Sequence, residues 1–257
     1  MKKNIIQSSN ETTETFPDIL KSLDKIDIED GIKQMILDQE KIFKIFKSNV
    51  KNINLIIYEM LKHIKGKKWK IFYVGAGTSA RIGVQDGSEL FPTFGWPKSR
   101  VKFIIAGGKK ALLKSIENAE DDIEDAKLQC KSKSISSSDV VIGLSASGST
   151  PFTNEVLKIA TKIGACTIGI TNNEKTSLEK FSKFCLVLNT GGELIGGSTR
   201  LKAGTSQKII LNIISTLLFS KLGYVKDGLM VNLKPTNKKL VLRKIKIKKA
   251  LSKTNKF

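Results

Sequence analysis

The feature that most constrains the fold is a series of five short, continuously apolar runs separated by longer segments with helical periodicity. The runs are Ile71–Val74, Val101–Ala106, Val140–Leu144, Cys166–Ile170 and Cys185–Leu188. Continuous apolar character is typical of parallel strands that are covered on both faces. The pattern predicts an α/β fold with a five-stranded, doubly wound, flavodoxin-like parallel sheet and helices on both faces. In such a sheet, ligands bind beyond the carboxyl ends of the strands.

The segments that flank this region are predicted to be mostly helical. Residues 1–16 are polar and are expected to be loose, and Asp18–Lys25 is a candidate short helix. Apolar residues then recur at helical spacing in Ile28–Phe46 and Val50–Lys65, which predicts two helices before the first strand. Beyond Gly223 the chain reads as a short extended piece and one amphipathic helix. The expected division is an N-terminal tail with helices (1–65), the α/β domain (66–224) and a C-terminal extension (225–257).

The net charge of +20 is the strongest compositional signal, but its make-up argues against a nucleic-acid partner. Only four of the 44 basic residues are arginines, at positions 81, 100, 200 and 243. Nucleic-acid readers rely on arginine forks and interleaved aromatic residues. Lysine spread over nearly every exposed face is better explained by a lysine-biased proteome. The positive charge can still attract an anionic substrate.

Several other classes of protein are excluded by pattern. No apolar run approaches the roughly 20 residues that a membrane span needs, and the N-terminus lacks the apolar region of a signal peptide. Cys130, Cys166 and Cys185 are scattered, and His63 is the single histidine, so no metal-ligand spacing is present. We therefore expect a cytoplasmic protein with no membrane partner, no metal and buried thiols.

The first strand, Lys70–Val74, ends in a glycine turn that opens a helix. Gly75 and Gly77 are followed by Thr78 and Ser79, so backbone N–H groups and two hydroxyls gather at a helix N-terminus, which favours an anion such as phosphate. The spacing also fits a variant dinucleotide fingerprint, which needs an acidic residue about 20 residues further on. The next strand runs into two glycines and a lysine instead, so the dinucleotide reading is disfavoured.

Polar residues also gather after the second, third and fifth strands. The loop after the third strand contains Ser145, Ser147, Gly148 and Thr150 before Pro151, and it fits either a helix N-cap or an anion cradle. The second strand is followed by several acids, among which pattern alone cannot choose. The last strand leads through a glycine-rich loop to a predicted helix over Ala203–Leu222, whose broad apolar face predicts a homodimer interface.

Five segments in order carry a resemblance to a known family. They are GAGTSARIGVQDGSELFPTFG, IENAED, GLSASGSTPF, GGSTRLKAGTSQKIILNIIST and GLMVNLKPTNKKL. Together they closely resemble the N-acetylmuramic acid 6-phosphate etherases, members of the sugar-isomerase (SIS) domain family, from about Ile26 to about Lys248. The resemblance implies an SIS fold and a sugar-phosphate substrate.

The resemblance also implies a reaction. Family members cleave the ether between the lactyl group and C3 of the amino sugar, giving N-acetylglucosamine 6-phosphate and D-lactate for amino sugar recycling, without a metal or organic cofactor. By motif, Glu89 matches the general acid that protonates the departing lactate, and Glu120 matches the base that removes the C2 proton. Two carboxyl groups in opposite proton states suit such an elimination.

Binding residues carry over by the same resemblance. Ser145, Ser147 and Thr150, around Gly148, match the loop that holds the sugar phosphate, while Ser149 stands where family members often have arginine. The residues expected over the sugar are Gly77, Thr78 and Ser79. The residues expected to close the pocket or to reach a second chain are Ser198, Arg200 and Lys202. Two alternatives stay open: a non-catalytic sugar-phosphate sensor that resembles the glucokinase regulatory proteins, and a sugar-phosphate isomerase of the same fold.

Overall fold

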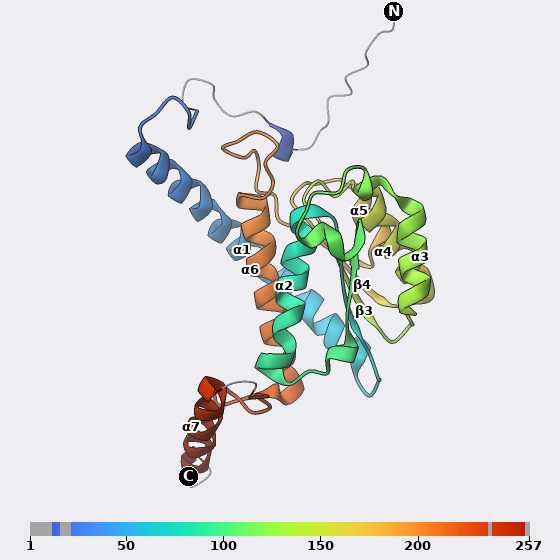
Figure 1. The fold of residues 1–257 in the computed structure, drawn as a ribbon, viewed down its shortest axis with the longest axis vertical. Helices are drawn as coiled ribbons and strands as arrows, with labels where there is room; N and C mark the ends of the chain where they lie inside the picture. The colour runs from blue at the N-terminus through green and yellow to red at the C-terminus, as the bar shows by residue number, and fades with distance from the viewer. Residues whose placement is uncertain (1–11, 16–21, 236–237, 255–257) are drawn as a thin grey trace, which may run out of the picture.

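The structure is a computed structural model that describes residues 12–15, 22–235 and 238–254 (Figure 1). Its centre is a five-stranded, all-parallel sheet with strand order β2-β1-β3-β4-β5. The strands are β1 (Ile71–Gly75), β2 (Val101–Ile105), β3 (Val140–Ser145), β4 (Cys166–Thr171) and β5 (Phe184–Val187). The predicted α/β fold and its parallel sheet are confirmed, and each predicted strand lies within one residue of its observed bounds.

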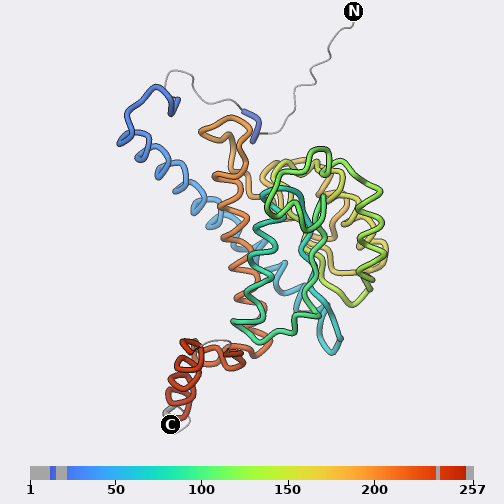
Figure 2. The backbone as a smooth tube through the Cα atoms, in the orientation of Figure 1, coloured from blue at the N-terminus to red at the C-terminus, as the bar shows by residue number. Residues whose placement is uncertain are grey.

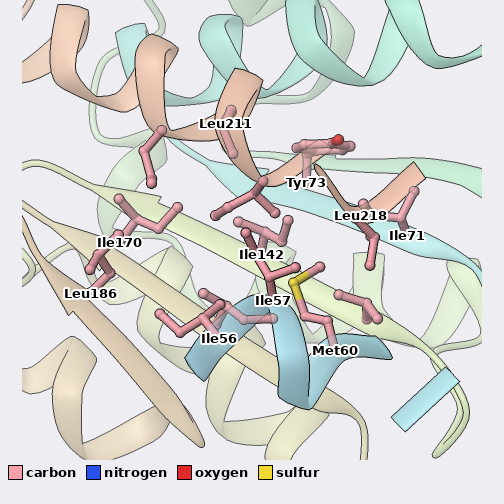
Figure 3. Packing of buried hydrophobic residues seen from close by; sticks show 14 of the residues in the cluster. Ile56, Ile57, Met60, Ile71, Tyr73, Ile142, Ile170, Leu186, Leu211 and Leu218 are labelled. Atoms are coloured by element: carbon pink, nitrogen blue, oxygen red, sulfur yellow. The ribbon is translucent and has the colours of Figure 1, made fainter. Parts of the chain in front are cut away.

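Helices cover both faces of the sheet. Successive side chains of a strand point to opposite faces, so each face has its own apolar cluster. Ile71 and Tyr73 of β1 pack in one apolar cluster, and Phe72 and Val74 pack in another. The first cluster lies under α1 (Ile28–Ile64), α2 (Gly77–Phe94) and α6 (Lys202–Phe219). The second lies under α3 (Ile123–Lys133), α4 (Pro151–Ile163) and α5 (Ser177–Phe181). Figure 3 shows Ile56, Ile57 and Met60 of α1 beside Ile142 of β3.

The prediction of two helices before the first strand is wrong, because α1 is one continuous helix of 37 residues. Asp27, just before it, is its N-cap residue, and the side chain of Asp27 accepts a hydrogen bond from Asp30 N. The polar stretch near its middle stays helical because Phe46 and Ile53, on either side of it, pack in the same apolar cluster. Within it, Ser48 Oγ and Asn49 Nδ2 both donate to the carbonyl of Ile45. The second half of α1 packs on the sheet, and the first half extends away from it (Figures 1 and 2).

The remaining segments also differ in detail from their predictions. The predicted helix over Asp18–Lys25 lies partly outside the described residues, and the described part forms a turn, with Lys25 N donating to Ser22 O. At its far end α6 passes into a π-helical turn, η6 (Ser220–Tyr224). The predicted extended piece is a short antiparallel hairpin of β6 (Val225–Lys226) and β7 (Leu229–Met230), followed by α7 (Lys238–Thr254).

Two further findings concern the described residues only. No helix among them combines the length and apolar character needed to cross a membrane. The thiols of Cys130 and Cys166 are buried, and burial raises the pKa of Cys130 to about 12 and that of Cys166 to about 11. Both thiols are therefore in the protonated, unreactive form at neutral pH.

Candidate active site

The loop after β3 brings three hydroxyl groups together at the start of α4. Ser145 Oγ lies 2.8 Å from Thr150 Oγ1 and 3.3 Å from Ser147 Oγ, and it accepts a hydrogen bond of 2.9 Å from Gly148 N. Thr150 is the N-cap residue of α4, but its side chain makes no cap hydrogen bond. The hydroxyl of Thr150 contacts that of Ser145 instead of an amide of the helix. This geometry favours the anion cradle over the simple N-cap reading.

Close contacts at Gly148 fix the conformation of this loop. Its φ is 73°, and an added Cβ atom would lie 2.5 Å from Thr176 Cβ and 2.6 Å from Thr171 Oγ1. The Gly148 carbonyl accepts hydrogen bonds from Leu178 N at 2.9 Å and Ser177 Oγ at 3.1 Å. The loop is therefore clamped against the connection from β4 to α5, and its hydroxyls are held in place before any ligand arrives.

A cavity of about 350 Å³ opens at the carboxyl ends of β1 and β2, and β1 pairs with β3, the strand that this loop follows. Gly77 and Thr78, at the start of α2, line one side, and Glu120, on the short turn η5 (Ala119–Asp121), lines another. Arg81 braces the cavity, donating through Nη2 and Nε to the carbonyls of Ala111 and Leu112 at the end of η4 (Gly108–Leu112). Gly77, Thr78 and Glu120 thus line one cavity, and their predicted roles toward a substrate stay a prediction. Ser79 is buried in the first turn of α2 and does not line the cavity.

Glu89 does not join Glu120 in this cavity. It is exposed on α2, 12 residues after Gly77, which corresponds to about 18 Å along the helix axis. One turn before it, Asp86 is buried and accepts hydrogen bonds from Tyr73 Oη at 2.7 Å and Ser215 Oγ at 3.1 Å. Burial raises the pKa of the Asp86 carboxyl. The two predicted catalytic carboxyl groups are therefore separate within one chain.

The glycine-rich loop before α6 also differs from expectation. Ser198 is half-buried and Arg200 is exposed, whereas Lys202 is 1% exposed. Lys202 Nζ donates to Asp38 Oδ1 of α1 at 2.7 Å and to the Gly192 carbonyl at 2.8 Å. The structure thus gives Lys202 a structural role, and its predicted contact with substrate stays a prediction, as do those of Ser198 and Arg200.

The first amides of α6 are capped by Glu193, a residue that the sequence analysis does not single out. The Glu193 carboxylate accepts hydrogen bonds from Lys202 N at 3.0 Å and Ala203 N at 2.8 Å, so it caps the helix. Burial raises the pKa of Glu193, although the two amide donors act in the opposite direction. Glu193 lies nine residues before Lys202, outside the position of an ordinary N-cap, so no local capping pattern identifies it. Asp38 is more remote still, and no local pattern identifies it either.

The buried ion pair leads to a stability prediction. Replacement of Asp38 by alanine leaves the Lys202 ammonium group buried without its charge partner, and we expect a loss of about 3 kcal/mol in the free energy of unfolding. Lys41, the exposed second partner of Asp38, provides the matched control, and Lys41→Ala is expected to cost less than about 1 kcal/mol. Urea denaturation measures both. Equal effects for the two variants would contradict the assignment.

Comparison with known proteins places this architecture in a family. Residues 52–161 match the family model of the glucokinase regulatory protein N-terminal SIS domain. The chain is 40% identical over 236 residues to the N-acetylmuramic acid 6-phosphate etherase of Staphylococcus epidermidis, covering 92% of this chain and 80% of that protein. It is 37% identical over 243 residues to the enzyme of the same name from Lactococcus lactis subsp. cremoris MG1363, covering 95% and 82%. The chain belongs to the N-acetylmuramic acid 6-phosphate etherase family.

Solved structures agree with this etherase family assignment at the level of the fold. The Escherichia coli CFT073 protein c3406 superposes with a TM-score of 0.57 at 18% identity and covers 79% of this chain and 97% of that chain. The Vibrio vulnificus NanR protein, complexed with ManNAc-6P, gives a TM-score of 0.50 at 15% identity and covers 85% and 68%. The etherase family chain therefore shares its fold with proteins of very different sequence.

Proposed function

We propose that this chain is an N-acetylmuramic acid 6-phosphate etherase that releases D-lactate and N-acetylglucosamine 6-phosphate. The observation that carries the proposal is that the Ser145–Thr150 hydroxyl loop and the cavity lined by Glu120 lie at the carboxyl ends of neighbouring strands of the sheet. The loop suits the phosphate, and the cavity suits the sugar. A phosphorylated sugar is too strongly hydrated to cross a bilayer unaided, so we also propose that the protein acts in the cytoplasm.

The proposed chemistry is an elimination followed by hydration. With the sugar ring open, the C1 aldehyde acidifies the C2 proton, and Glu120 removes it. The C2–C3 double bond forms as the C3–O bond breaks, and the departing lactate oxygen takes a proton from Glu89. Water then adds at C3, giving its proton to Glu89, and C2 regains a proton from Glu120. One water is consumed, and each glutamate ends in its starting state.

Glu89 can act in this scheme only if a second copy of the chain supplies it, because it lies far from the cavity in its own chain. We therefore propose a homodimer whose sites combine Glu120 of one protomer with Glu89 of the other. Apolar surface supports this assembly: a groove of about 640 Å³ between α1 and α6 is lined by Phe46, Val50, Tyr58 and Leu217 among others. The first half of α1, which extends away from the sheet, adds exposed apolar residues, including Ile28 and Ile36.

A complementation experiment tests this shared site. In co-expressed Glu89→Gln and Glu120→Gln chains, about half of all dimers are mixed, and each mixed dimer has one intact site of two. We expect about one quarter of wild-type lactate release from the co-expressed sample and almost none from either variant alone. Light scattering at micromolar concentration should report a dimer. No recovery in mixed dimers would contradict the shared site.

The proposed activity is tested by incubating the purified protein with N-acetylmuramic acid 6-phosphate and assaying D-lactate enzymatically. The expected result is equal amounts of D-lactate and N-acetylglucosamine 6-phosphate. A sugar-phosphate isomerase would interconvert aldose and ketose phosphates and release no lactate.

A second candidate, a non-catalytic sugar-phosphate regulator, is supported by the match to the glucokinase regulatory protein domain. It predicts tight binding of sugar phosphates with no turnover. The presence of acids at both motif positions, Glu89 and Glu120, favours the enzyme.

A further inference from the structure

A short N-terminal segment lies on the loops at the carboxyl edge of the sheet. It consists of η1 (Thr12–Glu14) and Thr15, and we call these four residues the N-terminal strap. Figure 1 shows the strap beside the loop that leads into α6, at the end of the molecule where α2 begins. Thr13 is completely buried. The expectation of a loose tail is therefore wrong for these residues, because they are held by contacts with residues distant in sequence.

Asn173, which follows β4, is the main receptor for the strap. Its Oδ1 accepts hydrogen bonds from Thr13 N at 3.1 Å and Thr12 Oγ1 at 2.9 Å. Its Nδ2 donates to Thr13 Oγ1 at 2.8 Å and to the carbonyl of Ala146 at 3.0 Å. An amide side chain offers two donor hydrogens and two acceptor lone pairs, so all four are in use. Three of these hydrogen bonds hold the strap, and the fourth holds Ala146 of the Ser145–Thr150 loop.

Two glycines of the loop before α6 provide an independent observation. An added Cβ atom at Gly192 would lie 2.9 Å from the Thr15 carbonyl oxygen, and one at Gly197 would lie 3.2 Å from Glu14 Oε2. The strap therefore covers this loop so closely that a side chain at Gly192 would displace backbone. The strap thus contacts the connections after β4 and β5, and Asn173 ties it to the loop after β3.

We propose that the N-terminal strap is a wall of the sugar-phosphate site, and that Asn173 is a positioning residue that holds it in register with the Ser145–Thr150 loop. This inference rests on the proposed function. The cavity with Glu120 flanks that loop on the side of β1 and β2, and the strap flanks it on the side of β4 and β5. A sugar whose phosphate sits on the loop is then enclosed from both sides, and displacement of the strap weakens its binding.

The main test is Thr13→Val, which keeps the shape of the side chain but removes the hydroxyl that accepts from Asn173. Thr13→Ser keeps the hydroxyl and is the matched control. Isothermal titration with N-acetylglucosamine 6-phosphate is expected to give a Kd about tenfold higher for Thr13→Val and within about twofold of wild type for Thr13→Ser. Turnover should show the same rise in KM with kcat nearly unchanged, since uniform binding is lost.

Gly192→Ala displaces the strap from its other side and leaves the Asn173 contacts in place. Gly192 does not have a positive φ, so alanine strains only the contact with Thr15. Gly192→Ala should also raise the Kd, and it replaces Thr13→Val as the test if that variant does not fold. Wild-type affinity in either variant, once folded, with only a lower melting temperature would overturn the proposal. Because the titration uses the product, it is valid even if the wild-type protein releases no lactate and the proposed function fails.

Discussion

Replacing Glu89 by glutamine is expected to lower D-lactate release by a factor of about 10²–10⁴, the usual effect of removing a general acid. Glutamine keeps the size of the side chain but cannot protonate the departing lactate oxygen. Glu89 is exposed on α2, so the fold and the melting temperature should not change. Steady-state lactate assays measure the loss, with Glu124→Gln on the exposed surface of α3 as the matched control with wild-type activity.

The same variant separates the roles of the two glutamates. If Glu89 acts only on the leaving group, Glu89→Gln still lets Glu120 remove the C2 proton of bound substrate. In deuterium oxide, the variant should therefore exchange the C2 proton of N-acetylmuramic acid 6-phosphate while releasing almost no lactate. Loss of both exchange and lactate release in a folded variant would show that Glu89 is not confined to the leaving group.

Glu120→Gln is expected to lower both the exchange of the C2 proton and the release of lactate, each by a factor of about 10²–10⁴. The amide cannot accept the C2 proton, so the step that precedes loss of lactate is blocked. Asp121→Asn is the matched control, because Asp121 lies on the same short turn but does not line the cavity. Proton NMR in deuterium oxide follows exchange and lactate together.

The outcome of this pair decides which acid is the base. Wild-type exchange in Glu120→Gln, or loss of exchange in Asp121→Asn, would contradict the assignment to Glu120. Sugar-phosphate binding should survive in Glu120→Gln, since the Ser145–Thr150 loop is held by contacts that do not involve the acids.

The strands and the hydroxyl-rich loop after β3 could be predicted from the sequence because their signals are local. A strand buried on both faces shows a continuous apolar run, and a loop of three hydroxyls around Gly148 stands out within a few residues. The end of a strand also determines the edge of the sheet on which its loop lies. Glu120 follows β2, and it therefore lies beside the turn that follows β1.

The features that the sequence did not predict depend on contacts between distant segments. The burial of Lys202 depends on Asp38, 164 residues away, and the ordering of Thr13 depends on Asn173, 160 residues away. Contacts between residues so far apart produce no periodic pattern in the local sequence. The separation of Glu89 from Glu120 follows from helix length: α2 carries Glu89 about three turns away from the site that its first turn helps to build.

The central claim is that this protein cleaves the lactyl ether by an elimination that starts at C2. The most direct test is a proton NMR time course of N-acetylmuramic acid 6-phosphate with the wild-type protein in deuterium oxide. We expect free lactate to appear in step with N-acetylglucosamine 6-phosphate that carries deuterium at C2. No lactate above the level of the Glu89→Gln, Glu120→Gln double variant, or lactate release with the C2 proton retained in the product, would contradict the claim.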